Sequence, residues 1–277
     1  MRRGIGRSSF FVGSVLWATA GWAAPAPPEP VIDCDPANYS TDDAPVPGTT
    51  VLSGQIIVGT ALGEKLNGTD EDDLIVGLGG NDKILGHAGN DILCGGEGND
   101  KIRGGKGMDV ADGGPGKDNI KTDSEADIQV GGPGRDRVDG GSGDDQIWGG
   151  PDDDKVVGEG GSDVLVGGPG NDKISGGGED DLMWGEEGDD RMVGGSENDT
   201  MEGGPGVDNM RGGGGDDSLD GGDDFDVLRG QSGDDILRGG GGPDKLDGSS
   251  GTDVLDGGDD VDFCKKGETY IDCETIK

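Results

Sequence analysis

The stretch GEGGSDVLVGGPGNDKISGGGEDDLMWG, residues 158–185, repeats one nine-residue phrase three times. In each copy an aspartate stands at the sixth position and a short apolar segment follows it. The residue directly after the aspartate alternates, because Val164 and Leu182 are apolar whereas Lys173 between them is cationic. This alternation predicts a structure whose own repeat is two phrases, or 18 residues, long.

The nine-residue period runs over residues 59–265 without an insertion or deletion, which makes 23 units. Position 1 is glycine in every unit except the one that opens at Thr122. Position 6 is aspartate in every unit except the first, which has Glu64. Position 8 is aliphatic or methionine nearly throughout, with Gln129 and Cys264 as the clear exceptions. Such a register is typical of a repeat architecture rather than of an acidic low-complexity tract.

Each unit predicts a turn followed by a very short strand. Glycines at positions 1, 2 and 4 supply backbone conformations that other residues rarely adopt. The three residues after the aspartate are extended, so position 8 points to one side and positions 7 and 9 point to the other. We therefore predict an all-β fold, a right-handed parallel β-roll (β-solenoid) with two repeats per coil. Position 8 fills its thin interior and the aspartates line both edges.

The composition requires a further source of stability. The chain has 64 glycines, 29% hydrophobic residues, and 59 acidic against 22 basic side chains. One aliphatic side chain per nine residues does not offset a backbone entropy of roughly 1 to 2 kcal/mol per residue. Carboxylates stacked about 4.8 Å apart also repel each other unless a cation neutralises them. Calcium suits these hard oxygen ligands better than Mg²⁺, and we expect about 20 potential sites between coils.

The units GGPGNDKIS, GGEGNDKIR and GGSGDDQIW resemble the nonapeptide G-G-x-G-x-D-x-U-x of RTX, or haemolysin-type, calcium-binding proteins. The resemblance covers about three quarters of the chain. It implies a parallel β-roll in which position-6 aspartates and backbone oxygens hold Ca²⁺ between turns. In units with glycine at positions 1 and 4, the implied metal ligands are Asp82, Asp91, Asp100, Asp109, Asp118, Asp136, Asp145, Asp163, Asp172, Asp190, Asp208, Asp217, Asp235, Asp244 and Asp253.

Some units depart from the family's pattern. An acidic residue at position 4 precedes a second set of implied ligands: Asp73, Asp154, Asp181, Asp199, Asp226 and Asp262. The unit TDSEADIQV, residues 122–130, departs at positions 1, 2, 4 and 8 together and contains Asp127. We expect the regularity of the roll to falter there, at a bulged turn or an empty site.

The ends of the chain predict export. Residues 1–23 combine three arginines with a short apolar run and small residues at a cleavage site, as in a signal peptide. Residues 24–58 then form a linker or cap, residues 59–265 the calcium-binding roll, and residues 266–277 a C-terminal cap. We expect a secreted or periplasmic protein that has no membrane span and, because it is strongly acidic, no affinity for nucleic acid.

We expect no enzymatic activity. The RTX family also includes enzymes and toxins, but the segments outside the repeat are short, and the single histidine, His87, stands at position 2 of a turn. A zinc-protease helix or a Ser-His-Asp set therefore has no basis in this chain. No catalytic residue and no organic cofactor is predicted.

Four cysteines in an exported chain predict two disulfides, with three possible pairings. A Cys264–Cys273 pair would close the open end of the roll. Cys34 and Cys94 then remain for each other, and the alternative is that one or both are free thiols.

The alternation at position 7 gives the two sheets different outer faces. One carries lysines and arginines and faces water. The other is apolar, and an apolar face of that extent marks a contact. Residues 51–59 and a Cys34–Cys94 bridge would cover only its first coils. Farther coils would then need a second subunit or an external protein or glycan ligand, with this candidate interaction face: Val130, Trp148, Val164, Val166, Leu182 and Trp184.

These observations favour a secreted calcium-binding repeat protein whose roll folds on binding Ca²⁺ and serves as a structural or interaction module. The alternative is an adhesive binder of glycan or ice, although the outward positions lack the flat threonine or asparagine array that ice binding favours. The third interpretation is a non-catalytic remnant of an RTX exoenzyme or toxin.

Overall fold

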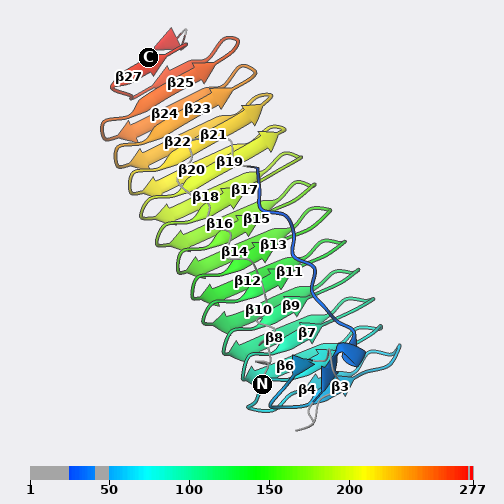
Figure 1. Cartoon of the computed structure of the whole chain (residues 1–277). Helices are drawn as coiled ribbons and strands as arrows, with labels where there is room; N and C mark the ends of the chain where they lie inside the picture. Colours follow the sequence, from blue (N-terminus) through cyan, green and yellow to red (C-terminus); the bar gives the residue numbers. More distant parts are fainter. Residues whose placement is uncertain (1–24, 41–49, 274, 277) are drawn as a thin grey trace, which may run out of the picture.

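The computed structural model describes residues 25–40, 50–273 and 275–276. Within them the chain winds into a parallel β-solenoid, in which two sheets of 13 strands lie face to face (Figure 1). Successive strands alternate between the sheets, and each strand pairs in parallel with the strands one coil away. The predicted two-unit coil is confirmed, because paired residues such as Ile75 and Leu93 are 18 residues apart.

The even-numbered strands form one sheet, called here the even sheet. Its strands are β4 (Lys65–Asn67), β6 (Lys83–Ala88), β8 (Lys101–Lys106), β10 (Asn119–Ser124), β12 (Arg137–Ser142), β14 (Lys155–Gly160), β16 (Lys173–Gly178), β18 (Arg191–Ser196), β20 (Asn209–Gly214), β22 (Val227–Ser232), β24 (Lys245–Ser250), β26 (Phe263–Lys265) and β28 (Thr275–Ile276). Most of them continue past the predicted three residues into positions 1 to 3 of the next unit.

The odd-numbered strands form the odd sheet. Its strands are β3 (Ile56–Val58), β5 (Leu74–Val76), β7 (Ile92–Cys94), β9 (Val110–Asp112), β11 (Ile128–Val130), β13 (Gln146–Trp148), β15 (Val164–Val166), β17 (Leu182–Trp184), β19 (Thr200–Pro205), β21 (Ser218–Asp223), β23 (Ile236–Gly240), β25 (Val254–Gly258) and β27 (Thr269–Ile271). Outside the roll, η1 (Pro36–Asn38) precedes a short parallel pair formed by β1 (Tyr39–Ser40) and β2 (Thr50–Val51).

The core is a single file of position-8 side chains between the two sheets. From Ile75 to Cys264 these side chains are almost wholly buried, and they alternate between the sheets along the stack. The one long polar side chain in this file is Gln129, which is also fully buried. This core is only one side chain thick. A second set of buried side chains, the aspartates, lies along the two edges of the roll.

The stack extends beyond the repeat at both ends. Before the first unit, β3 pairs with β5 and Ile57 packs against the core. After the last unit, β27 and β28 continue the two sheets, and Tyr270 packs against the core. The prediction that residues 51–59 lie across the first coils is confirmed only for Leu52, which packs against Leu74 and Ile92 on the outer face of the odd sheet. Residues 56–58 instead form β3 and complete the first coil themselves. The tail after Lys265 likewise adds strands to the roll.

Residues 25–34, called here the strap, run along the outside of the odd sheet in the direction opposite to the stack. Figure 1 shows this blue segment crossing the odd strands from the region of β19 down to η1. Its last residues alternate, since Val31 and Asp33 are exposed while Ile32 and Cys34 are half-buried against the sheet. Its prolines suit an extended segment that makes few backbone bonds of its own.

Candidate metal centre

The position-6 aspartates form two ladders, one along each edge of the roll. Each of them is at most 4% exposed. The backbone N–H of Asp91 donates to Oδ1 of Asp109 at 2.9 Å, and that of Asp109 donates to Oδ1 of Asp127 at 2.7 Å. The same bond joins each aspartate to the one 18 residues later, up to Asp253 on one edge and Asp262 on the other. One oxygen of each carboxylate therefore holds neighbouring coils together.

The second carboxylate oxygen, Oδ2, has no comparable partner. In the units with glycine at position 1, from Asp82 to Asp253, this atom is buried without a hydrogen bond. It lies against the position-1 glycine of its own unit: a Cβ on Gly113 would come 2.6 Å from Oδ2 of Asp118 and 2.5 Å from the carbonyl oxygen of Gly131. Position 1 is therefore glycine because the carboxylate and the next turn's carbonyl occupy the space of a side chain.

Burial raises the pKa of the ladder aspartates from Asp91 to Asp253 above the ordinary 3.8. For Asp145 the pKa reaches about 8. Burial is the main cause, the charges of Asp127 and Asp163 add to it, and the hydrogen bond from the Asp127 N–H opposes it. The pKa also reaches about 8 at Asp109, Asp154, Asp199 and Asp226. At neutral pH, ionising a whole ladder without a cation therefore costs free energy.

A divalent cation matches this arrangement. Carboxylate and carbonyl oxygens are the ligands that Ca²⁺ takes, six to eight at a time. Within the described residues, no three His, Cys, Asp or Glu side chains converge on one point. A metal site therefore has to combine ladder carboxylates with turn carbonyls, such as that of Gly131 beside Asp118. Each predicted ligand is a buried carboxylate of one of the two ladders, including those behind an acidic position 4.

Position 5 carries a second ladder that the sequence analysis missed. The N–H of Asn99 donates to Oδ1 of Asn81, and the N–H of Lys117 donates to Oδ1 of Asn99, both at 2.8 Å. These bonds run from the later coil to the earlier one, opposite in direction to the position-6 bonds. The recurrence of Asn or Asp at position 5 was the available signal.

Acidic residues at position 4, with the exception of Glu71, keep the turn despite the missing glycine. Glu125, Glu179 and Glu197 have φ values of 75°, 74° and 72°, and Asp152, Asp224 and Asp260 have similar positive values. A left-handed conformation at a residue with a Cβ costs roughly 1 to 2 kcal/mol. The local backbone of these turns is thus the same as in the consensus units, at a cost in strain.

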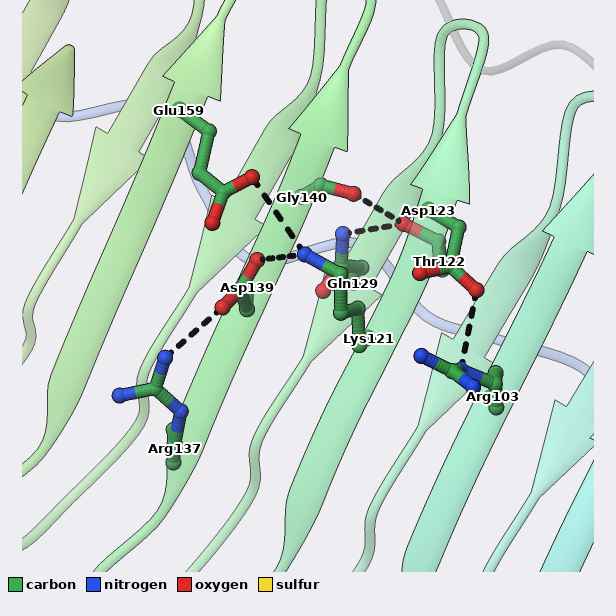
Figure 2. A network of polar contacts seen from close by, with 9 residues as sticks. All are labelled: Arg103, Lys121, Thr122, Asp123, Gln129, Arg137, Asp139, Gly140 and Glu159. Atoms are coloured by element: carbon green, nitrogen blue, oxygen red, sulfur yellow. Dashed lines mark hydrogen bonds and ion pairs between the residues drawn. The ribbon is translucent and has the colours of Figure 1, made fainter.

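The divergent unit does not interrupt the roll, so the predicted bulged turn at residues 122–130 is wrong, whereas the alternative of an empty calcium site there stays a prediction. Strands β10 and β11 pair with both neighbours in the common register. Asp123 takes the position-2 turn conformation with φ of 76°. Thr122 at position 1 is fully buried, donates to the carbonyl of Gly140 at 3.1 Å, and accepts a bond of 2.6 Å from Nε2 of Gln129 (Figure 2). Two polar substitutions thus compensate each other.

The predicted interaction face is covered from within the chain. Val130, Trp148 and Val166 are 3%, 6% and 3% exposed, and they pack against Ala26 and Ile32 of the strap. Trp184 belongs to the same cluster, and Val164 and Leu182 are half-buried. The prediction that these coils need an external partner is wrong, because an extended segment of ten residues reaches farther than we assumed.

Both disulfides have the favoured pairing. Cys34 and Cys94 are bonded, which fastens the strap to β7, and Cys264 and Cys273 are bonded at the end of the stack. The remaining motif, His87, is exposed at position 2 of its turn with φ of 90°. Among the described residues, no side chain forms a hydrogen bond or an ion pair with the His87 imidazole that would orient it as a base.

A family model described as the RTX calcium-binding nonapeptide repeat (4 copies) matches residues 58–93, 67–102, 95–128, 130–165, 157–192, 166–201, 193–228 and 229–264. Among solved structures, the chain is similar to the X-ray crystal structure of a hyperactive, Ca²⁺-dependent, β-helical antifreeze protein from an Antarctic bacterium. The identity is 20%, the TM-score 0.49, and the match covers 80% of each chain. A search of the curated proteins found no match. In the described residues no helix is long and apolar enough to cross a membrane.

Proposed function

Because the chain belongs to the family of RTX calcium-binding nonapeptide-repeat proteins, we propose that Ca²⁺ binding and folding of this β-roll are one coupled event in an exported, non-enzymatic structural protein. The observation that carries the proposal is the pair of aspartate ladders. From Asp82 to Asp253 the Oδ2 atoms are buried without hydrogen bonds, and the pKa values of the carboxyl groups are raised to between about 6 and about 8 over most of the stack.

The physical argument concerns the free energy of the metal-free coil. A buried carboxylate without a partner costs several kcal/mol when ionised, and this cost recurs at every coil. The core contributes one side chain per unit, which does not compensate for it. Calcium converts the repulsion within each ladder into shared coordination, so its binding energy becomes folding energy. We propose one site per pair of neighbouring coils on each edge, about 20 in all.

Export is the second element of the proposal. The predicted signal peptide, residues 1–23, lies outside the described residues. Two disulfides suit an oxidising compartment, and millimolar Ca²⁺ is the range in which extracellular modules bind it. A secreted or periplasmic protein would thus fold where calcium becomes available. A structural role is favoured over adhesion through the apolar face, since the strap covers much of that face.

The test compares the full chain after export, with its disulfides formed, in chelator and in Ca²⁺. We expect circular dichroism to show little β structure, and small-angle scattering an expanded chain, in chelator near pH 8. Added Ca²⁺ should give a compact β-rich particle, with many ions bound per chain by calorimetry. A compact β-rich protein in excess chelator at that pH would contradict the proposal.

A matched pair of variants assigns the sites. Asp145→Asn keeps an Oδ1 acceptor for the Asp127 N–H but replaces the buried Oδ2 with a donor, so it should lower the calcium stoichiometry. Asp144→Asn makes the same change of charge one residue away, at position 5, where Oδ1 accepts the N–H of Ser162. It should leave the stoichiometry unchanged. Equal losses in both variants would mean that net charge, not the position-6 ladder, governs calcium binding.

A further inference from the structure

The even sheet carries a column of stacked cations on its outer face. At position 7, Lys65 pairs in register with Lys83 and Lys83 with Lys101. Farther along, Lys155 pairs with Lys173 and Lys173 with Arg191. Registered neighbours lie about 4.8 Å apart along the stack. Like charges directly opposite each other destabilise a sheet, so these two runs need a reason other than strand stability.

The cations of both runs lack carboxylate partners in the described part of the chain. All six side chains are exposed, and none forms an ion pair with any carboxylate among those residues. In the second run, position 9 of the same strands holds Val157, Ser175 and Val193. Position 9 therefore offers no acidic side chain that could neutralise the column there.

The same face shows how the chain pairs its cations elsewhere. Between the two runs, Asp139 at position 9 is 5% exposed and binds Lys121 at 2.6 Å and Arg137 at 2.8 Å (Figure 2). Near the end of the stack, Asp247 at position 9 binds Lys265 at 2.7 Å. Elsewhere on this face, an acidic residue at position 9 therefore pairs with the cations. The two unpaired runs have no such acidic residue.

We propose that the unpaired columns Lys65–Lys83–Lys101 and Lys155–Lys173–Arg191 bind a linear acidic polysaccharide that lies along the axis of the roll. The column is one residue wide and is bounded by the acidic turns on the edge beside it. Only a narrow anionic chain contacts the cations without approaching those turns. A polyuronate, with one carboxylate per sugar on an extended chain, offers roughly one anion per coil at this spacing.

The surface does not suit nucleic acid. Single strands bind on aromatic side chains that stack with bases, and positions 7 and 9 of the even sheet contain no aromatic residue from Lys65 to Arg211. A duplex is wide enough to bring its phosphates over the acidic edges. The column thus selects a thin polyanion.

Calcium sets the condition for this binding. The whole chain carries a formal charge of −37, which repels any polyanion until the ladders are neutralised. The inference rests on the proposed calcium-dependent fold, and every measurement therefore includes circular dichroism of the same sample. A sample without Ca²⁺-induced β structure reports on the folding proposal, whereas a folded sample that does not bind reports on this one.

The experiment measures binding of a short oligogalacturonate, too short to gel with Ca²⁺, to the full chain at saturating Ca²⁺ and low salt. The methyl-esterified oligomer is the neutral probe. The column variant removes the cations of the second run and carries Lys155→Gln, Lys173→Gln and Arg191→Gln. The control variant loses the same charge outside the two runs, through Lys106→Gln at the end of β8 and through Lys117→Gln and Arg135→Gln in exposed turns.

We expect the acidic oligomer to bind, the ester not to bind, and added salt to weaken binding. The column variant should lose roughly tenfold in affinity for the acidic oligomer, and the control variant less than about twofold. The proposal would be overturned by equal losses of affinity in the two variants, by undiminished binding in the column variant, or by absence of binding to the folded protein. A single-stranded DNA oligonucleotide that binds as tightly as the uronate would also overturn it, in favour of a nucleic-acid surface.

Discussion

The indole nitrogen of Trp148 donates a hydrogen bond of 3.0 Å to the carbonyl oxygen of Pro27, a residue 121 positions earlier in the chain. Trp148 lies on the outside of the odd sheet, and Pro27 lies in the strap. Beyond the coils that the described strap crosses, β19 and β21 present Thr200, Glu202, Ser218 and Asp220, and apolar residues return at the outward position only with Ile236 and Val254. The strap and the apolar face are therefore two halves of one internal contact.

Removing the bridge that fastens the strap should expose this face. In the double variant Cys34→Ser/Cys94→Ser the bridge no longer closes a chain separation of 60 residues. We expect the Ca²⁺-loaded roll to lose roughly 2 to 4 kcal/mol of unfolding free energy. It should also bind a hydrophobic dye and self-associate in light scattering. The control, Cys264→Ser/Cys273→Ser, removes a bridge far from the strap, and it should not expose the face. Dye binding that is equal in the two variants would contradict the role of the strap.

The glycines at position 1 should be more sensitive to substitution than glycines on the outer surface of the roll. Gly113→Ala places a methyl group against Oδ2 of Asp118 and the carbonyl of Gly131, so we expect a loss of about 1 to 3 kcal/mol and weaker calcium binding. Gly160→Ala meets nothing within 4 Å, and its effect should stay within about 0.5 kcal/mol. Urea titrations at fixed Ca²⁺ measure both. A neutral Gly113→Ala would show that the turn yields easily.

The repeat predicted the fold because a strict period of nine with one buried position leaves few solutions. The neighbours of each strand residue one coil away follow from the period alone, as in the pairing of Ile92 with Val110. The predicted carboxylate ladder likewise follows from position 6. What the period does not encode is the direction of the hydrogen bonds, which assigns Oδ1 to the neighbouring coil and leaves Oδ2 toward the glycine.

The strap lay beyond sequence reasoning because it has no period. Residues 25–34 place few apolar side chains against the sheet, chiefly Ala26, Ile32 and Cys34, and their register depends on one disulfide and one tryptophan bond. The divergent unit was misjudged for a related reason. Its four departures were counted separately, whereas Thr122 and Gln129 act as a pair across the coil.

Acid should stabilise the metal-free roll. The pKa of Asp145 or Asp199 is about 8 in the folded state, against an ordinary value of 3.8. A folded-state pKa raised in this way contributes stability that is complete below about pH 4 and is lost as the pH rises through about 6 to 8. In chelator we therefore expect β structure to increase as the pH falls from 8 to 4.

With Ca²⁺ present the dependence on pH should reverse in part, since protons displace the metal from the same carboxylates. Calorimetric calcium affinity should fall over this range while circular dichroism still reports β structure. If circular dichroism shows that the protein in chelator stays unfolded at every pH, then neutralising the ladders is not sufficient and the metal's coordination geometry is required.

The last prediction concerns the buried amide of Gln129. Its Nε2 bonds to Thr122, but its Oε1 is buried without a partner. Gln129→Leu removes that orphan oxygen and supplies the aliphatic side chain that position 8 holds elsewhere, while the Thr122 hydroxyl keeps its bond to the carbonyl of Gly140. We expect a gain of about 1 to 2 kcal/mol in the unfolding free energy at fixed Ca²⁺.

Thr122→Gly alone should have the opposite effect, because Gln129 would then have two unsatisfied polar groups inside the core, at a cost of about 1 to 3 kcal/mol. Combined with Gln129→Leu, the same glycine restores the consensus at both positions and should no longer destabilise the roll. The double-mutant cycle, measured by urea unfolding, should therefore give a coupling energy of at least about 1 kcal/mol. Additive effects would mean that the two side chains do not act as a pair, and that the register through this unit is held by the backbone ladder alone.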